Sequence, residues 1–223
     1  MKFVSTDFSR DPDEELVFSF KGLFTTLWRE IFTLFKANVF FLLFSIPIIT
    51  FPCALTALFS VCIDAIRGKK SEVFKTYLNT IKSQFFISWL MLVLVAVSEF
   101  VSFYGAYSYF QRVAEHKILL IPGLILSVAA TMIVIAIPYL YCLLSKVDLR
   151  FKDVIKDAFL VAVLNLKFSI CSTVLAVVFL ASLFLFWLYM IPLMLTIAFA
   201  LCAYVSSYFS LYGIQKYILT EKL

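Results

Sequence analysis

Four long hydrophobic blocks constrain this chain more than any other feature. They cover residues 37–66, 85–110, 118–145 and 168–211. A helix needs about 20 apolar residues to cross the hydrocarbon core of a bilayer, and each block is longer than that. Hydrophobic residues make up 63% of the 223 positions and charged residues only 15%, a balance that is typical of integral membrane proteins. The sequence therefore predicts an all-α, polytopic transmembrane helical bundle that forms a single membrane domain over 1–223.

The block at 168–211 is too long for one crossing. Its 44 residues would form about 66 Å of helix at 1.5 Å per residue, whereas the hydrocarbon core is about 30 Å thick. A turn must therefore interrupt the block. Pro192 marks the predicted place, because proline suits the first position of a helix, where its missing N–H would have no partner. The blocks at 85–110 and 118–145 each predict one span.

The first block, at 37–66, is interpreted from the charges beside it. Five Lys or Arg residues precede it, and five follow it before the next block begins. Such an excess is typical of cytoplasmic loops, so the block should leave the cytoplasm and return to it. The turn is predicted around Pro47, Thr50 and Pro52. A five-segment alternative treats 37–66 as one kinked helix, which would place the basic residues after it outside.

Together these turns predict six membrane segments arranged as three proline-turned hairpins, with both termini in the cytoplasm. Pro52, Pro122 and Pro192 begin the returning arms at intervals of 70 residues. An amphipathic stretch precedes each hairpin and is predicted to form a helix on the cytoplasmic face. The resulting divisions are an N-terminal amphipathic helix region (1–36), hairpin 1 (37–66), an amphipathic helix with hairpin 2 (71–145), an amphipathic helix with hairpin 3 (148–211), and a tail (212–223).

Glu99 is the only acidic residue near the middle of a predicted span. A charged carboxylate at that depth costs about 2.5–3.5 kcal/mol or more, so the side chain should face the protein, be protonated, or both. One interpretation is a proton or substrate site. The other, which we favour, is a neutral carboxyl that joins helices through hydrogen bonds. Hydroxyl groups expected at a similar depth, which are possible hydrogen-bond partners of Glu99, belong to Thr50, Thr131, Ser182 and Thr196.

Sequence signatures of catalysis are absent. The chain has no G-x-x-x-x-G-K-[ST], G-x-G-x-x-G or H-E-x-x-H motif. Its five cysteines lie in apolar segments without paired spacing, and its one histidine is alone, which predicts no disulfide framework and no metal site. Asp64, close to Arg67, is interpreted as a solvated interfacial pair. The chain is therefore predicted to be non-enzymatic, with no catalytic, cofactor-binding or metal-binding residues. Its basic residues flank membrane segments, which argues against nucleic acid as a partner.

One run of the sequence resembles a known family. The residues from Asn38 to Leu58, with Pro47, Thr50 and Pro52 at the turn, are similar to the signature of the YesL-like family, small bacterial membrane proteins classed as a domain of unknown function. Phe51 stands where that family usually has glycine. The resemblance implies a bacterial plasma membrane, no established enzymatic activity, and genes that neighbour carbohydrate ABC importers and glycan-degrading enzymes.

Two functions follow as expectations. The first is an accessory subunit of a carbohydrate ABC importer, in contact with the lipid bilayer and with the permease or ATPase subunits. Its docking surface is predicted on the amphipathic segment that carries Phe151, Ile155 and Phe159. The alternative is a self-contained small-solute transporter or channel, built around Glu99 and a stripe in the last span that consists of Tyr204, Ser207, Tyr208 and Leu211. The spans contain little polar surface to line an aqueous path, which argues against the alternative.

Overall fold

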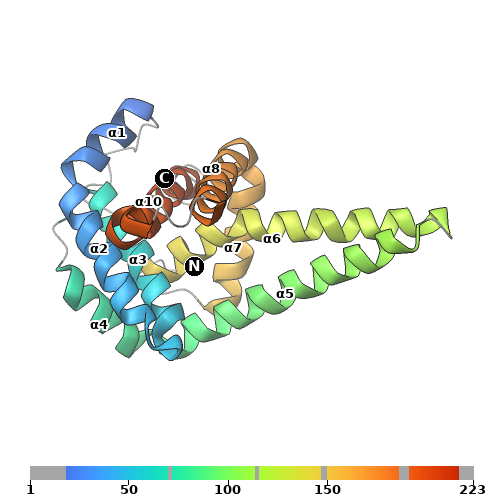
Figure 1. Cartoon of the computed structure of the whole chain (residues 1–223), viewed down its shortest axis with the longest axis horizontal. Helices are drawn as coiled ribbons and strands as arrows, with labels where there is room; N and C mark the ends of the chain where they lie inside the picture. The colour runs from blue at the N-terminus through green and yellow to red at the C-terminus, as the bar shows by residue number, and fades with distance from the viewer. Residues whose placement is uncertain (1–18, 70–71, 114–115, 147–149, 186–190, 216–223) are drawn as a thin grey trace.

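The computed structural model describes residues 19–69, 72–113, 116–146, 150–185 and 191–215, and every regular element in these ranges is helical. Figure 1 shows their arrangement. The all-α prediction is therefore confirmed. The α-helices are α1 (Phe20–Arg29), α2 (Ile31–Ser45), α3 (Phe51–Ile66), α4 (Val73–Ser83), α5 (Phe85–Gln111), α6 (Leu120–Lys146), α7 (Phe151–Leu164), α8 (Leu166–Leu185) and α10 (Phe199–Ile214); short 3-10 turns η1 (Ile48–Thr50) and η2 (Lys117–Leu119) and a π-helical segment η3 (Met194–Ala198) complete the set.

Four helical stretches are long and apolar enough to cross a membrane. They are Ile48–Ile66, Phe85–Gln111, Lys117–Lys146 and Ile191–Ile214. Helices α7 and α8 add a fifth if they count as one span, although the chain bends by 98° between them. These stretches are those expected of a multi-pass membrane protein, with four to five spans by length and composition. The six segments and the three hairpins are not confirmed, and the turn predicted before Pro192 falls on 186–190, outside the described ranges.

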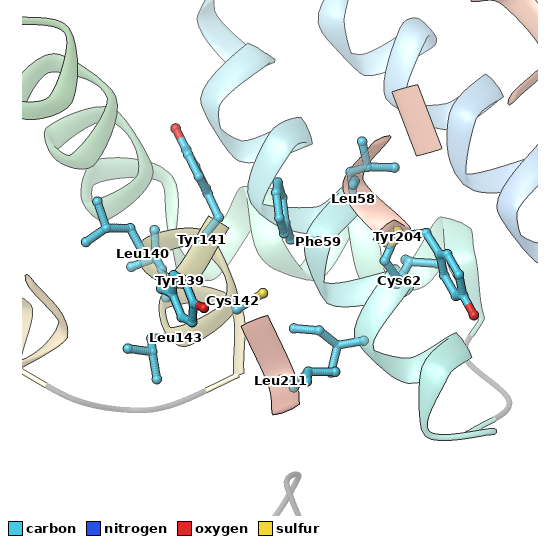
Figure 2. Packing of buried hydrophobic residues seen from close by; sticks show 14 of the residues in the cluster. Leu58, Phe59, Cys62, Tyr139, Leu140, Tyr141, Cys142, Leu143, Tyr204 and Leu211 are labelled. Carbon is cyan, nitrogen blue, oxygen red and sulfur yellow. The ribbon is translucent and has the colours of Figure 1, made fainter. Parts of the chain in front are cut away.

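Helix α3 lies at the centre of the bundle, between α2, α4, α6 and α10. Nearly all its side chains are buried, including the small residues Cys53, Ala54 and Ala57, which let neighbouring helices approach closely. Figure 2 shows Leu58 and Phe59 of α3 packed among side chains of α6 and α10. The ring of Phe59 stacks on that of Tyr141 with 5.5 Å between the ring centroids. The core is therefore built where three long apolar helices meet.

Helices α5 and α6 form an arm that leaves this bundle (Figure 1). They run antiparallel in close contact: a side chain at Gly105 would meet Leu126, and the ring of Phe110 lies against Gly123. Only 17% of the most apolar stretch of α5, and 11% of that of α6, is buried. We name this pair, Phe85–Gln111 with Leu120–Lys146, the α5–α6 arm. Its exposed apolar surface needs lipid or another protein to cover it.

The first predicted turn is present, but its surroundings do not fit the six-segment arrangement. Helix α2 ends at Ser45, and Pro52 lies in the first turn of α3. Thr50 donates its hydroxyl to the carbonyl of Pro47 at 2.9 Å. The indole of Trp89, near the start of α5, donates to the carbonyl of Ile49 at 2.7 Å. The predicted arrangement places these two groups on opposite membrane faces, about 30 Å apart.

Helix α4 explains the discrepancy. The sequence prediction places this amphipathic segment on the cytoplasmic face, whereas the structure packs it against α2 and α3. Tyr77 is fully buried and donates its hydroxyl to the carbonyl of Ala37 at 2.9 Å, and its ring stacks on Phe44. Burial raises the pKa of Tyr77 well above its ordinary value. Because α4 runs along the bundle, it returns the chain to the η1 end before α5 begins.

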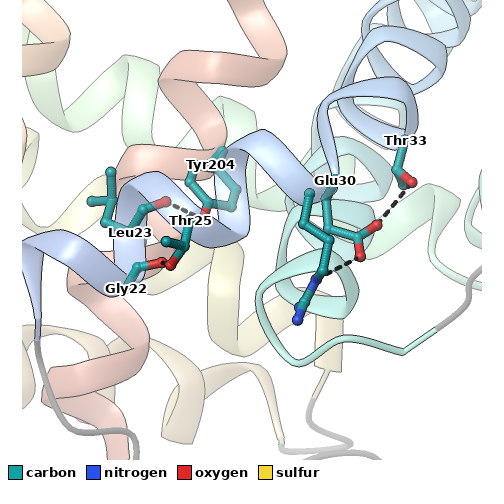
Figure 3. Close-up of polar contacts among 7 residues, drawn as sticks. Gly22, Leu23, Thr25, Glu30, Thr33 and Tyr204 are labelled. Carbon is teal, nitrogen blue, oxygen red and sulfur yellow. Dashed lines mark hydrogen bonds and ion pairs between the residues drawn. The ribbon is translucent and has the colours of Figure 1, made fainter.

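The first amphipathic stretch is two helices rather than one. The helix is interrupted at Glu30. The carboxylate of this residue accepts hydrogen bonds from Arg29 at 3.3 Å and from Thr33 at 3.0 Å (Figure 3). Helix α1 is capped by the hydroxyl of Ser19, which accepts from the backbone N–H of Gly22 at 3.4 Å. A side-chain acceptor at this position satisfies an N–H that has no partner within the helix. The remainder of the predicted region before residue 19 lies outside the described residues.

Candidate functional site

A buried ion pair joins the ends of α3 and α6. The Nζ of Lys146 donates to Oδ1 of Asp64 at 2.7 Å, and the two side chains are only 8% and 11% exposed. Removing two charges from water is costly, and their attraction offsets that cost only at close range with good geometry. The prediction that Asp64 belongs to a solvated pair at the membrane surface is therefore wrong. Asp64 faces into the bundle because α6 covers the end of α3.

Arg67 adds a second positive charge beside this pair. It caps the C-terminus of α3, where a cation interacts favourably with the helix dipole. Burial lowers the pKa of Arg67 to about 10, and the nearby carboxylate of Asp64 acts in the opposite direction. The guanidinium therefore keeps its charge at neutral pH. With Lys146 also positive, the cluster carries one more positive than negative charge.

Two serine side chains of α10 lie beside the same region. The hydroxyls of Ser207 and Ser210 are buried and make no hydrogen bond of normal geometry within the described part of the chain, although both lie next to the thiol of Cys142. The thiol of Cys62 donates to the carbonyl of Ala200 at 3.7 Å. We name Asp64, Arg67, Lys146, Ser207 and Ser210 the charged cluster. Nothing in it has the geometry of a nucleophile activated by a base.

Asn38 forms a second polar site, inside the bundle. Its side chain is fully buried, its amide Nδ2 donates to the carbonyl of Leu195 at 3.1 Å, and its Oδ1 accepts from the backbone N–H of Ala200 at 3.0 Å. Leu195 lies within η3, the π-helical segment, and Ala200 follows it in the first turn of α10. Such segments widen one helical turn and disturb the regular hydrogen bonding of the backbone. Asn38 therefore supplies the two hydrogen bonds that hold this turn against α2.

Sequence reasoning overlooked Asn38, which served only as the first residue of the family-like run. A usable signal was present, because this amide stands inside an otherwise apolar segment. A buried amide must find hydrogen-bond partners, and inside a bilayer those partners belong to other helices. The identity of the partners could not be read from the sequence, because Leu195 and Ala200 are more than 150 residues away.

Glu99 lies near the middle of α5 and is partly buried. Its Oε2 is buried and has no hydrogen-bond partner within the described ranges. The predicted partners are not brought to it, because each hydroxyl donates within its own segment. The acceptors are the carbonyls of Pro47 for Thr50, Ser127 for Thr131, Phe179 for Ser182 and Leu193 for Thr196. None of these four possible partners therefore hydrogen-bonds to Glu99 in the described ranges.

The predicted docking face of α7 is turned toward the chain itself. Phe151, Ile155 and Phe159 are partly buried and pack against the hydrophobic core. Their spacing at i, i+4 and i+8 correctly identified one helix face, but an amphipathic pattern cannot distinguish a foreign partner from a neighbouring helix. The exposed side chains of α7 include Lys152, Lys156 and Leu160 instead.

The tyrosines of the stripe in the last span also form contacts within the molecule. Tyr204 donates its hydroxyl to the carbonyl of Leu23 at 3.1 Å (Figure 3), and Tyr208 donates to the carbonyl of Ser19 at 3.0 Å. Both tyrosines are buried. These hydrogen bonds connect α1 to α10. The two hydroxyls therefore do not line a polar path.

In the ranges that the structure describes, no group of three His, Cys, Asp or Glu side chains could hold a metal ion. The polar sites in these ranges include the charged cluster, the Asn38 contact with η3, and Glu99 in the α5–α6 arm. The first two connect helices within the bundle, whereas the third lies outside it.

Comparison with known proteins gives a match to a family model. Residues 22–106 match the model of a family described as a protein of unknown function, DUF624. No curated protein and no solved structure matches the chain. The matched segment runs from α1 to α5 and includes Asn38, Asp64 and Glu99. It supports the resemblance to an uncharacterised family and carries no activity with it.

Proposed function

We propose that the chain is a non-enzymatic accessory subunit of a membrane complex in the bacterial plasma membrane. The observation that carries this proposal is the α5–α6 arm, whose apolar helices extend beyond the bundle with most of their surface uncovered. The resemblance to the YesL-like family supplies the candidate complex, a carbohydrate ABC importer with its permease and ATPase subunits. The proposed partner surface is the arm, and not the buried face of α7.

An aromatic group on α5 is the best docking surface of the arm. Phe100, Phe103, Tyr104 and Tyr107 are each more than half exposed. Phe100 and Tyr104 already stack on each other with 5.9 Å between the ring centroids, so a partner would meet a pre-arranged surface. Aromatic side chains are enriched among the residues that dominate binding energy, because they bury large area at low entropic cost. Inside lipid, helix association depends on such packing.

We expect the double variant Phe100→Ala with Tyr104→Ala to lose a co-purifying partner. Binding hot spots contribute about 2 kcal/mol or more, so retention of the partner should fall by at least about tenfold. The measurement is the ratio of partner to tagged full-length protein after purification from native membranes in mild detergent, with the partner identified by mass spectrometry. A permease or ATPase subunit is the expected partner.

The matched control removes two exposed aromatic side chains from a different helix. Phe24 and Trp28 of α1 are also strongly exposed, and replacing both by alanine should leave the partner in place. Equal loss from the two double variants would remove the basis for docking through the arm. A wild-type protein that purifies alone would contradict the accessory-subunit proposal itself.

A self-contained small-solute transporter or channel is the alternative. One observation favours it: the charged cluster places Asp64, Lys146 and two buried serine hydroxyls inside an apolar bundle. Its discriminating experiment is solute uptake into liposomes that contain only this chain. Uptake that disappears in a Ser207→Ala, Ser210→Ala variant of unchanged stability would establish the alternative over the accessory role.

A further inference from the structure

We infer that Glu99 is a proton-binding site inside the α5–α6 arm and that its carboxyl carries a proton at neutral pH. The inference depends on the arm lying in the bilayer and not on the identity of any partner. The inference concerns the protonation of the Glu99 carboxyl, which has no part in the proposed accessory role.

The position of Glu99 on α5 is the first observation. The residues of α5 that are buried or partly buried against α6 form one stripe, which includes Met91, Val95, Ser102 and Ala106. Glu99 lies on this stripe, four residues after Val95 and three before Ser102. Its carboxyl therefore meets the interface between the two helices, where Oε2 is buried without a hydrogen-bond partner in the described part of the chain.

The groups around Glu99 provide no compensating charge. The antiparallel register, fixed by the contacts of Gly105 with Leu126 and of Gly123 with Phe110, places Glu99 opposite the turn at 132–134. Between Leu120 and Pro138, α6 has no titratable side chain. On α5 the nearest titratable side chain is that of Tyr104, which is exposed and stacked on Phe100.

The other helices that pack against α5 do so at its start. The thiol of Cys53 in α3 donates to the carbonyl of Phe85 at 4.0 Å, and Thr56 hydrogen-bonds with Ser88 at 3.1 Å. The remaining titratable groups of α3 and α4 are held elsewhere or exposed: Cys62 on Ala200, Asp64 on Lys146, Tyr77 on Ala37, and Lys75 and Lys82 at the surface. No cation in these helices is placed to pair with Glu99.

An isolated charge in an apolar environment is neutralised by a change in protonation when no partner is available. The acid form of Glu99 fits the interface better, because burying a neutral carboxyl costs far less than burying an isolated ionised one. The ionised form would put an unpaired negative charge between α5 and α6. Loss of the proton should therefore draw water into the interface and loosen the packing of the arm.

Carbodiimide modification in bilayers tests the protonation state. A hydrophobic carbodiimide reacts with a protonated carboxyl: the proton moves to a carbodiimide nitrogen, the carboxylate oxygen adds to the central carbon, and the adduct rearranges to an N-acylurea. In the full-length protein reconstituted into lipid, we expect modification of Glu99 at neutral pH. Modification should fall by about tenfold for each pH unit above the midpoint of the titration. Peptide mass spectrometry locates and quantifies the adduct.

Glu72 provides the matched control, because its side chain is 79% exposed. A water-soluble carbodiimide should modify Glu72 and spare Glu99, and Glu99→Gln should abolish the adduct formed with the hydrophobic carbodiimide.

Infrared spectroscopy gives a readout that needs no labelling. The wild-type protein should show the carbonyl stretch of a protonated carboxyl, and Glu99→Gln should lack it. Modification of Glu99 that does not change with pH, equal reaction with the water-soluble reagent, or an absent carbonyl band would each overturn the inference.

Discussion

Asp64→Ala is expected to destabilise the protein by about 3–5 kcal/mol, since breaking a buried pair leaves an uncompensated charge. In this chain the stranded charge is the ammonium of Lys146, whose side chain is 8% exposed and which pairs with Asp64 at 2.7 Å. The neighbouring guanidinium of Arg67 adds repulsion once the carboxylate is gone. The measurement is thermal unfolding in detergent, followed by fluorescence-detected size exclusion.

A double substitution distinguishes the loss of the ion pair from the effect of leaving one buried charge unpaired. Asp64→Leu combined with Lys146→Met removes both charges, and apolar replacements of a buried pair are often neutral or stabilising. We therefore expect most of the stability lost in Asp64→Ala to return. The exposed pair of Glu72 and Lys75, with 3.8 Å between the charged atoms, is the control, because breaking such a pair changes stability by about 0–1 kcal/mol. An Asp64→Ala protein as stable as the wild type would show that the pair is solvated.

Asn38→Leu is expected to cost about 2–5 kcal/mol, although leucine has the same branched skeleton of side-chain heavy atoms. The substitution removes two hydrogen bonds and leaves the buried N–H of Ala200 and the partly buried carbonyl of Leu195 without their side-chain partner. Each buried polar group left unsatisfied costs about 1–3 kcal/mol. Thermal unfolding and protease resistance of the purified protein measure the effect.

Two further substitutions sharpen this prediction. Asn38→Asp keeps an acceptor for Ala200 but cannot donate to Leu195 and buries a negative charge, so it should be at least as damaging as Asn38→Leu. Asn79 is an exposed amide on α4, and Asn79→Leu should stay within about 0.5 kcal/mol of the wild type. If the two leucine variants were equally stable, the contact of Asn38 with η3 would contribute nothing to the fold.

The sequence predicted the elements whose determinants are local. The blocks at 85–110 and 118–145 correspond to α5 and to η2 with α6 within a residue or two, because length and apolar composition alone define them. The break between α2 and α3 was also predictable. Proline there removes a backbone donor and restricts the residue before it, which ends one helix and begins the next.

The arrangement of these elements was not predictable in the same way. The pattern of α4 correctly indicated a helix with one apolar face, but lipid headgroups and a neighbouring helix favour the same pattern. The structure buries Tyr77 against α2, which reverses the direction of the chain before α5. Likewise, Asp64 and Lys146 are 82 residues apart, and nothing in their own neighbourhoods indicates that they pair.

The central claim is that the α5–α6 arm crosses the bilayer from a bundle whose charged loops face the cytoplasm. Site-directed cysteine labelling with a membrane-impermeant reagent tests it most directly. Cys53, Cys62 and Cys142 are buried, so replacing only Cys171 and Cys202 by alanine should give a silent background. Single cysteines at Lys152 and His116, both exposed, then report the base and the tip of the arm.

We predict that His116→Cys reacts from outside intact cells, whereas Lys152→Cys reacts only after the cytoplasmic face is opened. Labelling of both positions from the same side would contradict a membrane-crossing arm.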